Sequence, residues 1–137
     1  MLSFTVYGNA APQGSMRAIT PKNFKYSVLV PQNTKTRPWK QEVAKTALAA
    51  RNEAGLAMMP RTTPVSVDIN FYFPKPKSAA KRIAYKTTKP DGDKLMRAVW
   101  DALTGIIFED DSQVVRWPGG KFFGEPARAE ITVSEVP

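Results

Sequence analysis

The sequence predicts one small domain of the α/β (α+β) class, with a single mixed β-sheet packed against two main helices. The chain has 137 residues, which is about the length of one domain. Some segments alternate apolar and polar residues as half-buried strands do, and others repeat apolar residues at helical spacing. These segments follow one another in the order β-α-β-α-β-β, so we expect one domain over residues 1–137 with no internal repeat.

The strands are predicted from alternation of apolar and polar residues. Residues 2–7 and 65–73 alternate most clearly, each with one apolar and one polar face. Residues 113–117 and 128–134 form two further expected strands, and Gly119-Gly120 is expected to be a turn between them. Residues 26–30 allow one more short strand.

The helices are predicted from apolar spacing and from residues typical of helix ends. The first begins at Thr36 with Pro38 in its first turn, and Gly55 follows its last residue. Trp39 lies on its apolar face and is predicted to anchor the core rather than to stack on bases. The second helix is expected from about residue 93 to residue 103, with Gly105 after its end.

The composition excludes several kinds of active site. The chain contains no cysteine and no histidine, which removes thiolate nucleophiles, Ser-His triads and the usual zinc sites. An enzyme with this composition must use carboxylates, lysine, arginine, hydroxyl groups or a hard metal ion. No apolar run approaches the length of a membrane span, so we expect no membrane segment and a cytoplasmic protein.

The charge of the chain is positive overall and unevenly distributed. The net charge is +8, and the residues up to Pro90 include 15 Lys and Arg against 3 acids. From Asp91 onward there are 5 basic residues against 9 acids. Such an excess favours a polyanionic partner, most often nucleic acid, although solvated loops of a generic basic protein are the alternative. The candidate DNA contacts lie in two irregular segments: Arg17, Lys22, Lys25, Lys75, Lys77, Lys81, Arg82, Lys86 and Lys89.

Asp91-Gly92-Asp93 stands immediately before the second helix. Two residues spaced i, i+2 project to the same side only in extended backbone, and Gly92 makes that backbone permissive. Two adjacent carboxylates repel each other and are relieved by a shared proton or a hard cation. Capping of the helix is the alternative role, and it accounts for one of the two.

Asp110-Asp111 forms a second acidic pair where the second helix leads into a strand. Adjacent residues in extended backbone face opposite sides, so only one of them is expected to join Asp91 and Asp93. The alternative is that both serve the turn alone.

Three motifs together resemble the RusA-type Holliday-junction resolvases. They are Asp91-Gly92-Asp93-Lys94-Leu95-Met96-Arg97, Asp101-Ala102-Leu103 and Asp110-Asp111-Ser112-Gln113-Val114-Val115. The corresponding family patterns are D-x-D-N-x-x-K, D-A-L and D-D-x-Q-V-V. The close resemblance covers the C-terminal third of the chain, and the remainder is similar only in the arrangement of its first strand and helix.

This resemblance implies a homodimeric endodeoxyribonuclease that cuts four-way or branched DNA by paired nicks. It implies a bacterial or phage origin and Mg²⁺, with Mn²⁺ as a substitute, held by the catalytic aspartates Asp91, Asp93 and Asp111. The family's asparagine is replaced by Lys94 and its catalytic lysine by Arg97. Arginine can clamp a phosphate but does not titrate as lysine does, so Lys94 is the alternative catalytic cation.

Two other functions are compatible with the same residues. One is a non-catalytic basic nucleic-acid-binding module in which the acidic turn is structural. It predicts salt-sensitive binding without strand scission. The other is a nuclease without preference for junctions, which competition with linear duplex DNA would reveal.

Overall fold

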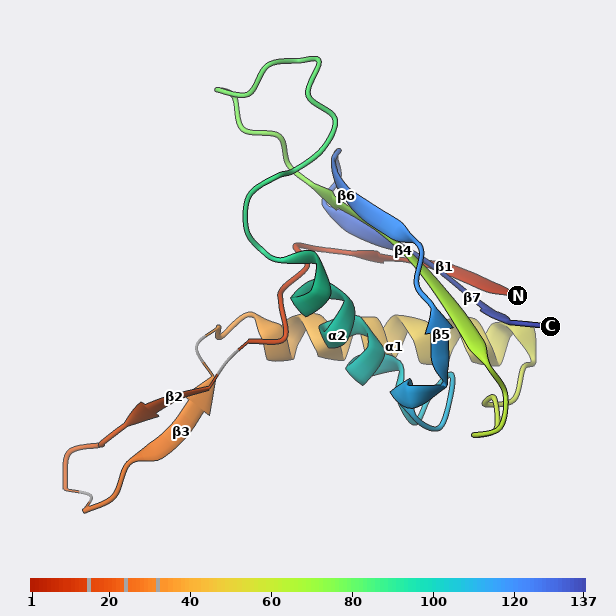
Figure 1. Ribbon diagram of the computed structural model, residues 1–137, viewed down its shortest axis with the longest axis horizontal. Helices are drawn as coiled ribbons and strands as arrows, with labels where there is room; N and C mark the ends of the chain where they lie inside the picture. The colour runs from red at the N-terminus through yellow and green to blue at the C-terminus, as the bar shows by residue number, and fades with distance from the viewer. Residues whose placement is uncertain (15, 24, 32) are drawn as a thin grey trace.

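The computed structural model describes residues 1–14, 16–23, 25–31 and 33–137. It consists of a five-stranded sheet with two helices on one face and a separate two-stranded hairpin (Figure 1). The α+β class predicted from the sequence is confirmed. The elements in chain order are β1 Leu2–Tyr7, β2 Met16–Ile19, β3 Val28–Pro31, α1 Thr36–Ala54, β4 Val65–Phe73, α2 Gly92–Leu103, the 3₁₀ turn η1 Asp111–Gln113, β5 Val114–Arg116, β6 Gly119–Phe123 and β7 Arg128–Glu135.

The main sheet is mixed, with β4 at its centre. β7 lies between β1 and β4 and is antiparallel to both. β5 and β6 pair in parallel with the other side of β4, β5 beside its first residues and β6 beside Ile69 to Phe73. The two short strands therefore form one interrupted strand, residues 114–123, along β4.

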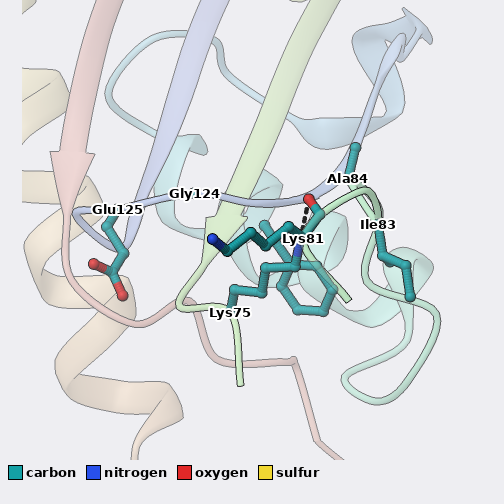
Figure 2. A pocket seen from close by; sticks show the side chains of 7 residues that line it. Lys75, Lys81, Ile83, Ala84, Gly124 and Glu125 are labelled. Atoms are coloured by element: carbon teal, nitrogen blue, oxygen red, sulfur yellow. Dashed lines mark hydrogen bonds between the residues drawn. The ribbon is translucent and has the colours of Figure 1, made fainter. Parts of the chain in front are cut away.

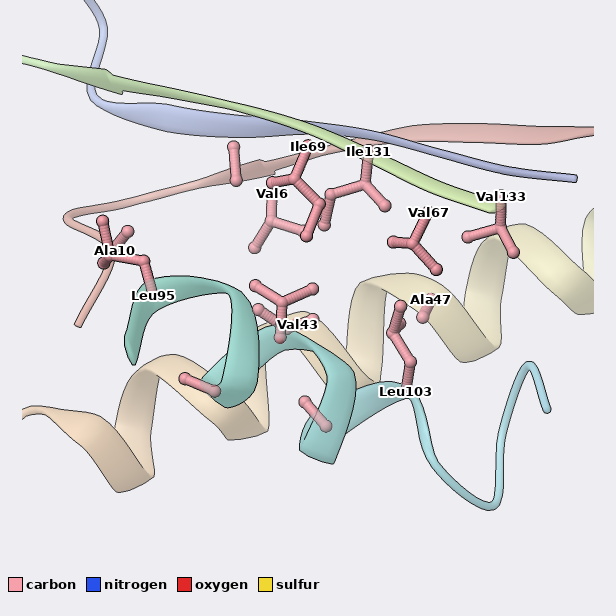
Figure 3. Close-up of a cluster of buried hydrophobic side chains, with 14 of the residues drawn as sticks. Val6, Ala10, Val43, Ala47, Val67, Ile69, Leu95, Leu103, Ile131 and Val133 are labelled. Atoms are coloured by element: carbon pink, nitrogen blue, oxygen red, sulfur yellow. The ribbon is translucent and has the colours of Figure 1, made fainter. Parts of the chain in front are cut away.

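The hydrophobic core fills the space between the sheet and the two helices (Figure 3). Val67 and Ile69 of β4 project toward Val43 of α1 and Leu95 of α2, and all four side chains are at most 2% exposed. Trp39 is 4% exposed, which confirms its predicted place in the core. Each fully buried aliphatic side chain of this kind contributes about 1.5–3 kcal/mol, so the core fixes α2 against the sheet.

Two sequence expectations are wrong in the C-terminal part of the chain. Gly119-Gly120 does not form a turn but begins β6, and Gln113 belongs to η1 rather than to the following strand. A Cβ atom on Gly119 would lie 1.8 Å from the carbonyl oxygen of Ile69. Glycine is therefore needed here because β4 and β6 approach closely, not because the chain reverses.

The N-terminal irregular segment contains more structure than its sequence indicates. β2 and β3 pair as an antiparallel hairpin that projects away from the body (Figure 1). The short strand allowed over residues 26–30 lies at Val28–Pro31, and its partner β2 was not predicted. Among the described residues, no helix combines the length and hydropathy needed to cross a bilayer.

The second face of the sheet carries the polar positions of the alternating strands. Ser66, Asp68 and Asn70 of β4 lie on it, opposite the buried residues of the same strand. Both helices lie on the other side of the sheet (Figure 3), and no helix or strand in the described ranges covers this face. We refer to it below as the open face.

Candidate active site and nucleic-acid interface

Asp91 and Asp93 flank the first residue of α2. Asp91 has extended backbone, with φ −68° and ψ 140°, and Asp93 lies in the first helical turn. The Asp91 carboxylate makes no capping hydrogen bond to α2. Its Oδ2 instead lies 3.7 Å from the Nζ of Lys94, and both side chains are partly exposed. Helix capping therefore does not occupy Asp91, whose carboxylate is accessible to a ligand.

The turn that carries Asp91 is held by contacts from distant parts of the chain. The Lys121 ammonium donates hydrogen bonds to the carbonyl oxygens of Thr88 and Pro90, each at 2.7 Å. The backbone N–H of Gln13 donates to the carbonyl oxygen of Lys94 at 2.9 Å. Lys121 was absent from the residues predicted from the sequence, because no motif includes it.

Arg97 and Asp101 lie on the exposed side of α2 but have different surroundings. Arg97 is exposed and four residues after Asp93, so the two share one helix face. Asp101 forms an ion pair with Lys40 of α1, and Lys40 also donates a hydrogen bond to Oε1 of Gln13 at 3.1 Å. The aspartate of the D-A-L motif thus connects the two helices, whereas Arg97 faces solvent beside the acidic turn.

Asp110 is occupied by the 3₁₀ turn that follows it. Its carboxylate accepts hydrogen bonds from the hydroxyl and the backbone N–H of Ser112, and its own N–H donates to Oε1 of Gln113 at 2.9 Å. The Ser112 hydroxyl, followed by the Ser112 N–H, lowers the pKa of Asp110 below its ordinary value. Of the two adjacent aspartates, Asp111 is therefore the one left exposed for another role.

Gln113 fixes this turn to the beginning of β4. Its side chain is buried, and its Nε2 donates to the carbonyl oxygens of Pro60 at 2.7 Å and Thr63 at 3.1 Å. Three of its hydrogen-bonding positions are thus satisfied, which makes the arrangement rigid. The glutamine of the D-D-x-Q-V-V motif therefore fixes the place of the 3₁₀ turn that begins at Asp111.

Asp91 and Asp93 lie at the N-terminal end of α2, whereas Asp111 begins η1, which follows the C-terminal end of α2. The 12 residues of α2 span about 18 Å. Strand pairing indicates the same separation. Val114, which follows the Asp111 turn, pairs with Val65 at the beginning of β4. Lys121, which holds the Asp91 turn, pairs with Phe71 near the end of β4. Across the described ranges, no three acidic side chains lie close enough to share a metal ion. Within one chain, the three predicted aspartates are therefore not brought together.

The basic residues predicted to bind DNA lie in two arms on either side of the start of α2. Lys22 and Lys25 are exposed in the connection between β2 and β3. Arg17 lies in β2, and its side chain is outside the described part of the structure. The second arm is the loop of residues 74–90, hereafter the basic loop. Figure 1 shows the N-terminal end of α2 between the hairpin and this loop.

The basic loop is anchored at its base and exposed at its tip. Lys75 donates a hydrogen bond to the carbonyl oxygen of Lys81 at 2.7 Å, and the Lys86 ammonium lies 5.5 Å from the centre of the Phe73 ring. Lys77, Arg82 and Lys89 are exposed, as is the side chain of Lys81. Between the loop and the end of β6 lies a pocket of about 240 Å³ (Figure 2). It is lined by Lys75, Lys81, Ile83, Ala84, Phe123, Gly124 and Glu125.

Comparison with known proteins gives one family and two informative relatives. The model of the family described as Endodeoxyribonuclease RusA matches residues 9–134. A Bacillus subtilis protein named Uncharacterized protein YqaN is 38% identical, over 98% of this chain and 96% of its own length. The Crossover junction endodeoxyribonuclease rusA of Lactococcus phage r1t is 31% identical over 77 residues, which cover 56% of this chain and 58% of the phage protein.

Proposed function

The chain belongs to the RusA family of endodeoxyribonucleases, and from this membership we propose that it resolves four-way or branched DNA by Mg²⁺-dependent hydrolysis of paired phosphodiester bonds. The observation that carries the proposal is the position of Asp91 and Asp93. These exposed carboxylates lie at the start of α2, between two arms rich in lysine and arginine. A polyanion held by both arms would pass over the acidic turn, where its phosphates meet oxygen ligands for a cation. We infer that the protein acts on DNA in the cytoplasm of a bacterial cell, encoded by the bacterium or by a phage.

The residues at the turn fit a magnesium ion. Mg²⁺ keeps several waters and is commonly bound by one or two carboxylates together with substrate phosphates. Asp91 and Asp93 would supply these carboxylates, and Mn²⁺ has the same preference for oxygen ligands. A metal ion held by Asp91 and Asp93 would supply the positive charge that polarises a phosphate and makes water more nucleophilic.

The remaining charges of the turn would position the scissile phosphate. Arg97 can donate two parallel hydrogen bonds to phosphate oxygens and stabilise the charge that develops on them. Lys94 lies beside the Asp91 carboxylate and can place a second positive charge near the leaving oxygen. Lys121 holds the backbone before Asp91, which keeps the carboxylate in its place.

Asp111 would act in this site only if a second copy of the chain supplied it. Paired nicks require two active sites, most simply related by a twofold axis. A homodimer in which Asp111 of one subunit approaches Asp91 and Asp93 of the other would complete both sites at once. The distance along α2 within one chain is the reason for this part of the proposal.

The substitution Asp91→Asn tests the metal ligand. We expect cleavage of a synthetic four-way junction in Mg²⁺ or Mn²⁺ to fall by more than about 100-fold, while junction binding is retained. Loss of a residue that only orients a metal ligand already lowers activity by about 10–100-fold, and loss of a ligand itself should cost more. Asp68→Asn, which removes a carboxylate from the open face, is the matched control and should cleave normally. Unchanged cleavage by Asp91→Asn would refute the metal site. No scission by the unmodified protein in any divalent metal would favour the non-catalytic binding module.

Mixing two inactive variants tests whether the site is shared between subunits. If Asp111 comes from the partner subunit, a heterodimer of Asp91→Asn and Asp111→Asn has one site with both substitutions and one site intact. Mixed and re-equilibrated variants should then nick one strand of the junction, although neither variant does so alone. If each subunit forms its own site, both sites of the heterodimer are damaged and the mixture stays inactive.

Competition with linear duplex DNA in the same cleavage assay measures the preference of the protein for junctions.

A further inference from the structure

A row of aromatic side chains and one arginine crosses the open face of the sheet. Tyr7 pairs with Arg128, and Arg128 pairs with Tyr72 on the other side of β7. Tyr72 pairs with Phe122 of β6, and Phe122 forms an isolated bridge with Tyr85 of the basic loop. Directly paired residues of neighbouring strands project from the same face. The five side chains, hereafter the aromatic row, therefore lie side by side across the width of the sheet.

Four of the five members of the aromatic row contact one another in sequence. The Tyr72 and Phe122 rings stack with their centres 5.4 Å apart, and the Tyr85 and Phe122 rings are 5.3 Å apart. The Arg128 guanidinium lies 4.0 Å from the centre of the Tyr72 ring and pairs with Glu130. The result is a run of three aromatic rings and a guanidinium group, with Tyr7 paired beside its Arg128 end.

Stability alone does not account for both ends of the row. Cross-strand packing explains the half-buried Tyr72 and Phe122 in the middle. Tyr7 and Tyr85, in contrast, are 63% and 62% exposed, on the face that lies away from the core. The sequence also leaves room for the central rings: a Cβ atom on Gly124 would lie 2.7 Å from Cδ1 of Tyr72. Aromatic rings gathered in one row of paired side chains, rather than scattered singly over the surface, are typical of a binding surface.

The charges around the row indicate what it binds. Tyr85 lies within the basic loop, which contains six lysine and arginine residues and no acid. The rest of the open face bears the acids Asp68 and Glu130 and one base, Arg116, which pairs with Ser66. The excess of positive charge, which favours an anion, therefore lies at the end of the row near the loop. A partner that fits has flat aromatic groups for the row and negative charges for the loop. Nucleotides of a single DNA strand have both, and their bases stack on aromatic side chains irrespective of sequence.

We propose that the aromatic row is a stacking platform for unpaired DNA bases, with the basic loop binding the adjoining phosphates. It rests on the proposed function, because a branched junction offers unpaired bases once base pairs at the branch point open. The two sites meet at β6: Phe122 belongs to the row, while its neighbour Lys121 holds the Asp91 turn. A strand displaced from the junction can thus pass over the edge of the sheet from the acidic turn to the row.

Binding to single-stranded DNA tests the proposal. The full-length protein is titrated, without divalent metal, against a fluorescein-labelled oligothymidylate and against a blunt duplex, and fluorescence anisotropy is recorded. We expect Tyr85→Leu to weaken single-strand binding about 10-fold and duplex binding less than about 2-fold. Tyr85→Trp should restore single-strand binding. Trp117→Leu, which removes another half-exposed aromatic ring outside the row, is the matched control and should bind both probes normally.

Three results would overturn the proposal: unchanged single-strand binding by Tyr85→Leu, equal weakening by Trp117→Leu, or no rescue by Tyr85→Trp. If Tyr85→Leu changes only the mass of the protein in light scattering, the row is instead a contact between copies of the chain. Junction cleavage in Mg²⁺ is measured separately. If the protein cleaves junctions but Tyr85→Leu does not change single-strand binding, only the stacking proposal is refuted. If Tyr85→Leu weakens single-strand binding but the unmodified protein does not cleave junctions, only the proposed nuclease function is refuted.

Discussion

Among single residues, Lys121 has the clearest effect on the geometry of the acidic turn. Its ammonium donates to two carbonyl oxygens immediately before Asp91, and the side chain is half-buried. Hydrogen bonds to charged groups are worth about 1.5–3 kcal/mol. We expect Lys121→Met to lower the free energy of unfolding by about 1–3 kcal/mol, measured in urea. It should also speed exchange of the backbone amides of Thr88, Lys89 and Asp91. Junction cleavage should fall with it, because Asp91 is no longer held.

Lys45→Met is the control for Lys121→Met, since it removes the same charge from the exposed side of α1. Its effect on unfolding should stay within about 0.5 kcal/mol. If Lys121→Met matched this control in unfolding, in amide exchange and in cleavage, Lys121 would not position the turn.

The candidate site could be predicted from the sequence only where its residues form local motifs. The spacing of Asp91 and Asp93 follows from a short pattern, whereas Asp111 is chosen over Asp110 only by the resemblance to a known family. Lys121 and Gln113 act on carbonyl groups 31 and 53 residues away, so no local pattern reveals their roles. The separation of Asp111 from Asp91 and Asp93 depends on how α2 is directed along β4. Only the folded structure shows this direction.

At the scale of elements, Gly119 determines whether β6 can pair with β4. Its φ is +133°, and a Cβ atom would meet the Ile69 carbonyl oxygen at 1.8 Å. Gly119→Ala combines backbone strain with a steric clash, so we expect a loss of about 2–5 kcal/mol of unfolding free energy in urea. Gly55→Ala is the control, because Gly55 also has positive φ, +66°, but no atom within 4 Å of the added Cβ. It should cost about 1 kcal/mol. Equal losses would contradict the role of close strand approach.

The elements that could be predicted from sequence are those that face the core. β1 and β4 have the predicted bounds, and α1 begins at Thr36 and is followed by Gly55, because burial of one face imposes a period on the residues. The β2–β3 hairpin extends away from the body, so burial imposes no such period on it. β6 is half-buried along most of its length and begins with two glycines. Two adjacent glycines predict a turn from sequence, and only the pairing with β4 shows that they belong to a strand.

Over the whole molecule, the uneven charge of the sequence becomes a spatial arrangement. The basic N-terminal part supplies both arms, and the acidic C-terminal part supplies the two ends of α2. If the two arms bind phosphates, their lysine and arginine residues should contribute more to DNA affinity than the same number of lysine and arginine residues elsewhere on the surface. Counterion release makes this measurable, because each phosphate contact adds about 0.9 to the slope of log K against log salt concentration.

Two double variants with the same net charge separate these possibilities. Lys77→Gln with Arg82→Gln removes two exposed charges from the basic loop, and Lys45→Gln with Arg61→Gln removes two exposed charges from elsewhere. In junction binding followed by fluorescence anisotropy over a range of salt, the loop variant should lose up to about 1.8 of the slope. The second pair should keep the slope of the unmodified protein. If both variants lose affinity and slope equally, the DNA responds to the overall charge of the protein, and the loop has no specific place in the interface.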